Sequence, residues 1–421
     1  MNFWAKIFYR YRRIIKTVQL FLIIAGPGLL VMIADNDAGG ITTYAATGSK
    51  YGYGLLWFLV LLGPVAYFVQ EMTVRLGAVT KRGHAEAIFE AFGSFWGWFS
   101  LIDLFLSDWL TLITEFIGMT AALSIFHIPA IVTVLVVCVL MGIMVMQGRY
   151  WTWEKIAFVF AALNVIYIPA AFNAHPQVRE VFNGLVPFFP GGFNNQIFFF
   201  LMANIGTTIA PWMLFFQQSS VVDKGMQEKD IPWGRVDTAM GALFTVVVAI
   251  FVIIVTGTFL RGVDIQSADQ AARFLMGINK YEGTFLAIGL FNAGFLGAIC
   301  ISLASSWAVG EVFGWAHSLN RKVKEAPWFY ASYFLAILSA GAVVLIPGAP
   351  LVVITLFVQV IAVTLLPAAL VFLIILLNDK ETMGDYANTP FQNFVNITIV
   401  AGIIILSTLY GVSALFPNLF K

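Results

Sequence analysis

The sequence has few charged residues: they make up 11% of the 421 positions, whereas a soluble domain has about 25%. Lys and Arg (23) almost balance Asp and Glu (22), so the net charge of +1 provides no basic surface for nucleic acid. The two cysteines, Cys138 and Cys300, each lie inside an apolar stretch, which excludes a disulfide framework. Together with 60% hydrophobic residues, these shortages predict an integral membrane protein that crosses the bilayer several times.

Catalytic motifs are also missing from the apolar segments. No Ser/His/Asp set, HExxH motif or cysteine nucleophile falls within them, so we expect no enzymatic activity and no resident cofactor. The four histidines, His84, His127, His175 and His317, fall in predicted loops or at the ends of spans. Residues 1–16 are basic and aromatic and lead into the first apolar run without a cleavage site, so no signal peptide is predicted.

Eleven apolar segments are long enough to cross a bilayer, which takes about 20 residues each. They are 17–48, 53–77, 95–125, 128–147, 154–173, 195–222, 239–260, 283–310, 327–346, 350–377 and 392–415. With the N-terminus placed in the cytoplasm, 17 of the 23 Lys and Arg residues fall on the cytoplasmic side. This asymmetry predicts a multi-pass plasma-membrane protein with a cytoplasmic N-terminus and an extracellular C-terminus.

Two shorter features accompany the spans. Glu71 and Arg75, four residues apart at the cytoplasmic end of the second span, are predicted to form an ion pair. The loop 261–282 is predicted to contain a short amphipathic helix. Neither this loop nor 174–194 is long enough to fold alone, so we expect residues 1–421 to form a single transmembrane domain. The only evident partners of this domain are the lipid bilayer and a transported substrate.

The first span is interrupted by Asp35-Asn36-Asp37-Ala38-Gly39-Gly40. A carboxylate near the bilayer midplane costs several kcal/mol, and glycine weakens a helix. Irregular backbone at membrane depth is tolerated only where it lines a cavity or is buried in protein. The segment therefore predicts a broken helix that forms a cation site.

The sixth span has a comparable interruption between Gly206 and Pro211. Proline removes a backbone donor and disfavours helix at the residue before it, so two half-helices with an unwound centre are expected. Interrupted spans at matching positions of two halves indicate inverted repeats around a binding site. We predict a first repeat at 17–173, a second at 195–377 and an extra helix at 392–415.

The residues near these breaks favour a hard cation. Asp37, Asp35, Thr207 and the backbone carbonyls supply oxygen, whereas no imidazole or thiolate reaches the midplane. Oxygen-only sites suit Mg²⁺, Ca²⁺ or Mn²⁺ better than softer metals. The small residues Ala38, Gly39, Gly40 and Ala210 are expected to leave room for a partly hydrated ion, which favours Mg²⁺.

Several motifs resemble the NRAMP divalent-metal transporters. They are Gly26-Pro27-Gly28-Leu29-Leu30-Val31, then Asp37-x-Gly39, then Tyr51-Gly52-Tyr53-x-Leu55-Leu56-Trp57, and Arg75-Leu76-Gly77 after the second span. The resemblance covers nearly the whole chain. It implies an all-α membrane protein with the LeuT-type fold, eleven transmembrane helices, two inverted five-helix repeats with broken helices 1 and 6, and a divalent-cation substrate.

The resemblance also assigns individual residues. The family's Asp-Pro-Gly-Asn is Asp37-Ala38-Gly39-Gly40 here, and its Met-Pro-His is Ala210-Pro211-Trp212, so an amide, a thioether and a histidine are replaced. Glu115 is kept, but the family's Asp three residues earlier is Leu112. Gln359 matches a glutamine of the tenth span. This combination is similar to the NRAMP-related magnesium transporters.

We therefore predict a transporter for Mg²⁺, with Mn²⁺ as a second cargo, that works without obligatory proton coupling. The metal-site residues are Asp37, Asp35, Gly206, Thr207, Ala210 and Gln359; the residues that shape the site are Gly39, Gly40, Pro211 and Trp212; and Glu115 belongs to a polar pathway. Two alternatives remain at this point: a proton-coupled Mn²⁺ or Fe²⁺ carrier, and an amino-acid transporter on the same fold.

Overall fold

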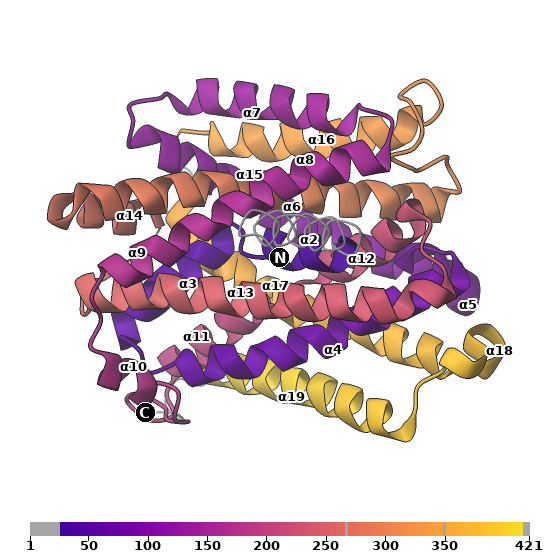
Figure 1. The fold of residues 1–421 in the computed structure, drawn as a ribbon. Helices are drawn as coiled ribbons and strands as arrows, with labels where there is room; N and C mark the ends of the chain where they lie inside the picture. Colours follow the sequence, from indigo (N-terminus) through magenta and orange to yellow (C-terminus); the bar gives the residue numbers. More distant parts are fainter. Residues whose placement is uncertain (1–25, 266–267, 348–350, 416–421) are drawn as a thin grey trace, which may run out of the picture.

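The computed structural model describes residues 26–265, 268–347 and 351–415. These residues are 81% helical and contain no strands. The helices form a bundle of elongated rods that run roughly along one direction (Figure 1). This arrangement confirms the predicted all-α class and suits a membrane, because helices satisfy their backbone hydrogen bonds internally.

Most predicted spans correspond to helices within a few residues. In chain order the helices are α2 (Pro27–Ala34), α3 (Ala38–Tyr51), α4 (Leu56–Thr80), α5 (His84–Phe92), α6 (Ser94–Ser124), α7 (Ala130–Val145), α8 (Tyr150–Leu163), α9 (Tyr167–Asn173), α10 (Val178–Asn183), α11 (Asn195–Gly206), α12 (Pro211–Lys224), α13 (Ile231–Phe259), α14 (Ala268–Ile278), α15 (Lys280–Phe313), α16 (Pro327–Val344), α17 (Leu351–Asn378), α18 (Lys380–Met383) and α19 (Pro390–Leu415).

Both predicted breaks are present in the structure. The first span consists of α2 and α3, separated by residues 35–37, and its predicted start at 17–25 lies outside the described residues. The sixth span consists of α11 and α12, separated by residues 207–210, with Pro211 as the first residue of α12. Proline suits this first position because its missing N–H would have no partner there.

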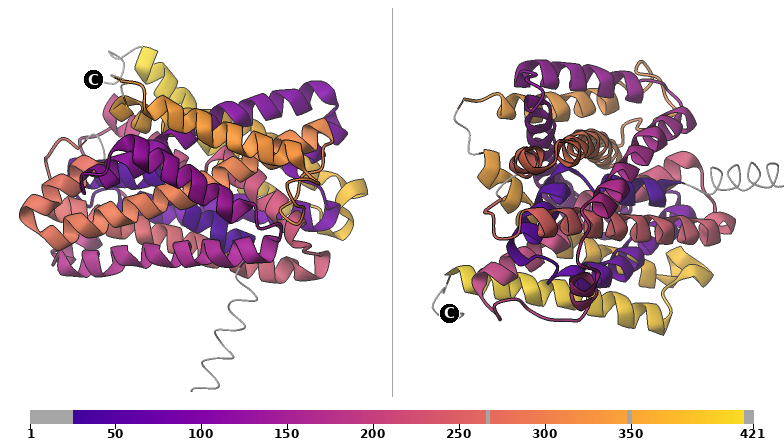
Figure 2. Two further views of the ribbon diagram at one scale, coloured as in Figure 1. Left: turned by 90° about the horizontal axis from the view of Figure 1, so that it is seen from above. Right: turned by 60° about the vertical axis from the view of Figure 1, so that its left-hand side comes forward.

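The broken helices lie inside the bundle. The edges are formed by α7 with α16 on one side and by α4 with α19 on the other (Figure 1), and Figure 2 shows the same bundle from two further directions. Helices α6 and α15 pack along each other next to α3. Every residue from Gly26 to Ser49 and from Gly206 to Val221 is buried, so the two breaks are enclosed by protein.

Three details differ from or add to the sequence prediction. The seventh span begins at Ile231 and not at residue 239, so Asp237 lies within α13. The fifth span is divided by a 3-10 turn, Asn164–Ile166, between α8 and α9. A helix that was not predicted, α5, connects α4 to α6, and the predicted helix in the loop 261–282 is present as α14.

Helix α5 begins on a carboxylate from another helix. The Glu311 side chain of α15 accepts hydrogen bonds from the backbone N–H groups of Ala85 (3.0 Å) and Glu86 (3.3 Å). The Ser219 hydroxyl of α12 donates to the same carboxylate at 2.6 Å. Glu311 therefore supplies the N-terminal cap that α5 does not make with its own residues.

Length and composition alone mark eight candidate membrane spans among the described residues, with α7 as a shorter apolar helix. Two of the eight join neighbouring α-helices: Tyr150–Asn173 covers α8 and α9, and Asn195–Lys224 covers α11 and α12. The eleven-span count, the repeat boundaries and the orientation of the termini remain predictions from the sequence.

Candidate functional site

Asp37 lies at the start of α3 and caps it. Its Oδ1 accepts the backbone N–H of Gly40 at 2.6 Å, and its own carbonyl accepts the N–H of Ile41 at 2.9 Å. The residue has extended backbone and is only 3% exposed. A carboxylate is favoured at this end of a helix by the helix dipole. Asp37 therefore has a structural role in addition to the ligand role predicted for it.

Glu115 of α6 caps the same helix end from outside. Its Oε2 accepts the N–H of Ala38 at 2.9 Å, and its Oε1 accepts the hydroxyl of Thr114 at 3.2 Å. The approach is possible because α15 has glycine at 297: a Cβ built there would lie 2.9 Å from the Cβ of Asp37 and 3.1 Å from Oε2 of Glu115. Glu115, predicted as part of a polar pathway, is thus a direct neighbour of Asp37.

Asp35 and Asn36 occupy the unwound segment between α2 and α3. They are 1% and 0% exposed. Among the described residues, Oδ2 of Asp35 and both side-chain polar atoms of Asn36 have no hydrogen-bond partner. Buried polar atoms are rarely left without partners, and each such atom needs an explanation. A bound cation with its water would supply partners for these oxygen atoms.

The second break leaves backbone oxygen free. The carbonyl of Ile205 accepts from both Thr208 and Ile209, while Ala210 donates its N–H to the sulfur of Met213 at 3.3 Å. The carbonyl of Gly206 receives no backbone N–H in this part of the described chain. It lies at the C-terminal end of α11, where the helix dipole attracts cations. Gly206 therefore offers a carbonyl oxygen at the break, and its role as a ligand remains a prediction.

Thr207 and Ala210 already take part in hydrogen bonds at the second break. The hydroxyl of Thr207 donates back to the carbonyl of Asn204 at 3.0 Å, and its own carbonyl accepts the Tyr44 hydroxyl at 3.3 Å. The carbonyl of Ala210 accepts the N–H of Met213 at 3.2 Å. Both residues lie at the break, but each would have to offer an oxygen that already has one hydrogen bond.

Gln359 of α17 lies between the two breaks. A Cβ built on Gly39 would lie 2.0 Å from its Nε2, and one built on Gly206 would lie 2.1 Å from its backbone oxygen. The side chain is 1% exposed, and its Nε2 has no partner among the described residues. The structure thus brings α3, α11 and α17 together at the position that the family resemblance assigned to this glutamine.

This arrangement changes the meaning of the glycines. Gly39 and Gly206 do not leave an empty space, because Gln359 fills it. A Cβ on Gly40 would lie 3.2 Å from the carbonyl oxygen of Asp35 and 3.3 Å from Oδ1 of Asp37. The glycines permit close approach of other groups and do not provide free volume. A preference for a hydrated ion therefore depends on the chemistry of the donors more than on the size of the site.

Pro211 and Trp212 shape the other wall of the break. Pro211 starts α12 directly after the extended residue Ala210. Trp212 is fully buried, and its ring meets that of Phe216 edge-on at 6.1 Å between centroids. Its indole Nε1 has no hydrogen-bond partner within the described part of the chain. Trp212 therefore contributes bulk and one donor where a histidine was expected from the family pattern.

Electrostatically the site is acidic. None of the ion pairs among the described residues involves Asp35, Asp37 or Glu115, although all three are at least 97% buried. Buried charges in membrane proteins are paired or bind ions. No group of three His, Cys, Asp or Glu side chains is close enough to hold a metal in the described residues, so a cation here would depend on carbonyl and amide oxygen as well.

Sequence reasoning missed Asp237, which holds α2 in place. Its Oδ1 accepts the N–H of Gly26 and its Oδ2 accepts the N–H of Gly28, both at 2.7 Å. Helix α2 has no side-chain cap of its own. Asp237 lies just outside the predicted seventh span, 239–260. An acidic residue two positions before an apolar span was the only available signal.

The chain matches a protein family and several members of it. The model of the Nramp family, "natural resistance-associated macrophage protein-like", matches residues 28–413. The divalent metal cation transporter MntH of Caldanaerobacter subterraneus subsp. tengcongensis is 24% identical over 408 residues, which cover 93% of both chains. MntH of Bradyrhizobium diazoefficiens is 28% identical, over 92% of this chain and 88% of its own.

Solved structures show the same fold. The Eremococcus coleocola manganese transporter, in complex with an aromatic bis-isothiourea compound, aligns with a TM-score of 0.78 at 20% identity, over 94% of this chain and 87% of that chain. MhsT in complex with L-phenylalanine aligns with a TM-score of 0.58 at 13% identity. These likenesses confirm the LeuT-like fold that was expected from the resemblance.

Proposed function

The chain belongs to the Nramp family, and on that premise we propose that it transports divalent metal cations across a membrane, with Mg²⁺ as the main cargo and Mn²⁺ as a second one. The ion would bind between the unwound centres of the first and sixth spans. Asp37 supplies the charged ligand, and Asp35, the Gly206 carbonyl and Gln359 contact the ion or its water. Thr207 and Ala210 contribute a carbonyl or hydroxyl oxygen through a lone pair that their present hydrogen bonds leave free.

One observation carries the proposal. Asp35 and Asp37 at the first break, and Glu115 beside it, are buried carboxyl groups with no basic partner among the described residues. An uncompensated buried charge costs several kcal/mol, and a divalent cation offsets this cost when it binds. An amino-acid carboxylate would instead add negative charge, so the acidic site favours a metal over an anionic substrate.

The donor set supports Mg²⁺ over softer metals. Met213, the thioether at the second break, has its sulfur turned to the Ala210 N–H, and the side chain of Met32 packs against Gly241 on α13. Oxygen is therefore the donor that the site presents, and oxygen ligands suit Mg²⁺, Ca²⁺ and Mn²⁺. The solved relative from Eremococcus coleocola is a manganese transporter by name. We propose that Ala210 and Gly40 cause the different ion preference of this chain.

Proton coupling is not obligatory in this proposal. The family's histidine in the sixth span is Trp212 here, and its aspartate before Glu115 is Leu112. Neither replacement can exchange a proton near neutral pH. Ion entry would then be driven by the cation gradient and the membrane potential alone.

Flux into proteoliposomes tests the site. We expect Asp37→Ala and Asp37→Asn both to lower Mg²⁺ entry at least tenfold, because each removes the charge. Asn keeps an oxygen that can accept the Gly40 N–H, so recovery of flux in Asp37→Asn alone would assign Asp37 to capping and contradict its ligand role. Asp379→Asn, at an exposed turn before α18, is the matched control and should transport normally.

Selectivity and coupling need separate measurements. Millimolar Mg²⁺ should inhibit uptake of trace Mn²⁺ if both ions share this site; Mn²⁺ uptake that ignores Mg²⁺ would indicate a Mn²⁺ or Fe²⁺ carrier. A pH dye inside the vesicles should report no acidification during Mg²⁺ entry. Acidification that follows Mg²⁺ and is absent from protein-free vesicles would refute uncoupled transport.

A further inference from the structure

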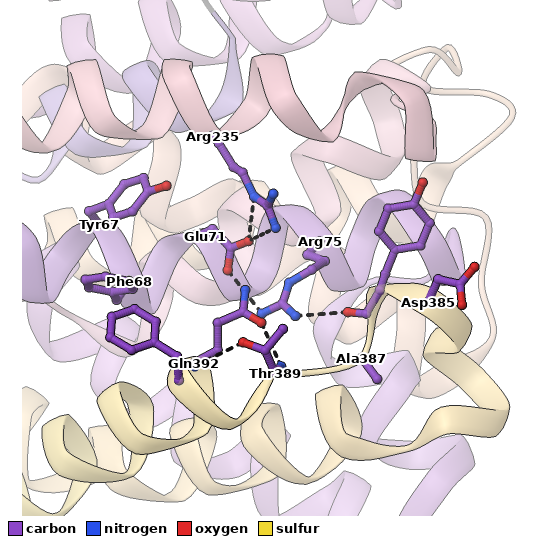
Figure 3. Close-up of a pocket in the computed structure, with 11 residues that line it drawn as sticks. Tyr67, Phe68, Glu71, Arg75, Arg235, Asp385, Ala387, Thr389 and Gln392 are labelled. Carbon is purple, nitrogen blue, oxygen red and sulfur yellow. Dashed lines mark hydrogen bonds and ion pairs between the residues drawn. The ribbon is translucent and has the colours of Figure 1, made fainter.

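A pocket of about 530 Å³ lies between α4, α13 and α19, away from the proposed ion site (Figure 3). It is found near the C-terminal end of α4 and at the N-terminal ends of α13 and α19. Helices α4, α13 and α19 are long and apolar enough to cross a membrane. A pocket near their ends would lie where the hydrocarbon core meets the lipid headgroups. Its volume is within the usual range for small-molecule sites.

Two guanidinium groups in the pocket share one buried carboxylate. Arg75 donates to Oε2 of Glu71 at 3.1 Å, which confirms the predicted ion pair, and Arg235 contacts Oε1 at 2.9 Å. Arg75 is buried and also donates to the carbonyl of Tyr386 at 2.9 Å, but its Nε has no partner in the described chain. The side chain of Arg235 is 40% exposed. Together, the two guanidinium groups and the carboxylate have a net charge of +1.

A helix N-terminus adds to this positive potential. Helix α19 begins at Pro390, and Thr389 and Gln392 line the pocket. Gln392 accepts the N–H of Thr389 through Oε1 at 2.9 Å, so its amide NH₂ can still donate. Asp385 lies at the rim, with its carboxylate directed away from the guanidinium groups (Figure 3). The centre of the pocket therefore favours an anion.

The remaining wall is aromatic. Tyr67 and Phe68 of α4 lie on the side of the pocket opposite Asp385 (Figure 3). Phe391 of α19 also lines the pocket. Phe391 is 66% exposed, so its ring reaches beyond the helix surface toward lipid. Aromatic side chains are typical of the boundary between hydrocarbon and headgroups. One end of the pocket thus suits a phosphate and the other an acyl chain.

We propose that this pocket binds an anionic phospholipid of the adjacent leaflet, with its phosphate beside Arg235 and the start of α19 and its glycerol and upper acyl chains against Phe391. Basic pockets between transmembrane helices are known to bind such headgroups. The bound lipid would connect α19, which lies at the edge of the bundle, to α4 and α13. The proposal does not depend on which ion is transported.

Lipid titration of the purified full chain tests it. Thermal unfolding in detergent is followed while phosphatidylglycerol or phosphatidylcholine is added, and bound lipid is counted by native mass spectrometry. We expect stabilisation by phosphatidylglycerol in excess of phosphatidylcholine, and about fivefold weaker binding for Arg235→Gln, from about 1 kcal/mol per interfacial Arg. Arg82→Gln is the control: this residue is in an exposed ion pair with Glu90 and does not line the pocket. An equal effect of both variants would overturn the proposal.

A second pair of variants leaves the ion pairs intact, in case Arg235→Gln does not fold. Phe391→Ala should weaken phosphatidylglycerol binding, whereas Phe394→Ala, which is 71% exposed on the same helix but outside the pocket, should not. Glycerol phosphate and inorganic phosphate distinguish a lipid from a free anion. Stabilisation by either at millimolar concentration, or equal stabilisation by both lipids, would refute a phospholipid site.

Discussion

Replacing Asp237 should release the half-helix that carries the proposed ion site. Its two carboxylate oxygens accept the N–H groups of Gly26 and Gly28 at 2.7 Å each, and the group is 2% exposed. Hydrogen bonds to a charged group contribute about 1.5–3 kcal/mol each, and loss of a cap costs about 0.5–2 kcal/mol. Because these terms overlap, we expect Asp237→Ala to lower the free energy of unfolding by about 3 kcal/mol.

Asp237→Asn should have a smaller effect. Its single carbonyl oxygen can accept one of the two N–H groups, while the NH₂ group faces the other donor. We expect a loss of about 1–2 kcal/mol, since one buried N–H then has no acceptor. The assay is unfolding by a denaturing detergent, monitored by tryptophan fluorescence, together with Mg²⁺ flux in proteoliposomes.

The matched control for this series is Asp230→Ala. Asp230 accepts the N–H of Gln227 at 3.0 Å within its own turn, so its removal affects only a local contact and should cost less than about 1 kcal/mol. If Asp237→Ala destabilised the protein no more than Asp230→Ala, the idea that α2 is held by this carboxylate would be wrong. Unchanged Mg²⁺ flux in a destabilised Asp237→Ala variant would show that this carboxylate contributes to stability and not to transport.

Two further predictions concern packing and pH. Gly206→Ala should abolish transport and lower the free energy of unfolding by about 1–3 kcal/mol, because its Cβ would lie 2.1 Å from the backbone oxygen of Gln359. The control is Gly402→Ala, whose Cβ has no atom within 4 Å. This variant should be neutral or slightly stabilising in thermal unfolding. Burial lowers the pKa of His84, on α5 outside the spans, to about 4. The contribution of the neutral imidazole to the free energy of unfolding is therefore complete above the ordinary pKa of 6.5. This contribution is lost as pH falls from 6.5 to 4, by up to about 3 kcal/mol. His84→Gln should reduce the fall of stability in that window, and identical acid unfolding curves would contradict this origin.

The two helix breaks could be predicted from the sequence because their causes are local. Pro211 cannot donate a backbone hydrogen bond, and Asp35 and Asp37 are costly in a continuous membrane helix. The position of Gln359 is different: nothing near it in the sequence connects it to Gly39 or Gly206, and it was assigned by family resemblance alone. The structure then places it against both glycines.

Two other features could not be predicted because they depend on distant partners. Asp237 contacts Gly26 across 211 positions, and its apolar surroundings become evident only when α2 packs on α13. His84 was placed in a loop, yet it is fully buried against Gln218 of α12, with a hydrogen bond of 2.8 Å. Both are polar residues at a span end, where such residues are usually exposed, so nothing in the local sequence indicates their burial.

Capping from another helix also has a consequence for how the chain is made. The N–H groups at the start of α2 find their acceptor in Asp237, and those of α5 find theirs in Glu311. Synthesis proceeds from the N-terminus, so the first half-helix enters the bilayer before its acceptor exists. Helix α2 cannot complete its hydrogen bonds until more than half of the 421 residues have been synthesised and α13 has been inserted. A ribosome-bound chain that ends before residue 237 should therefore expose this segment to protease or to membrane chaperones.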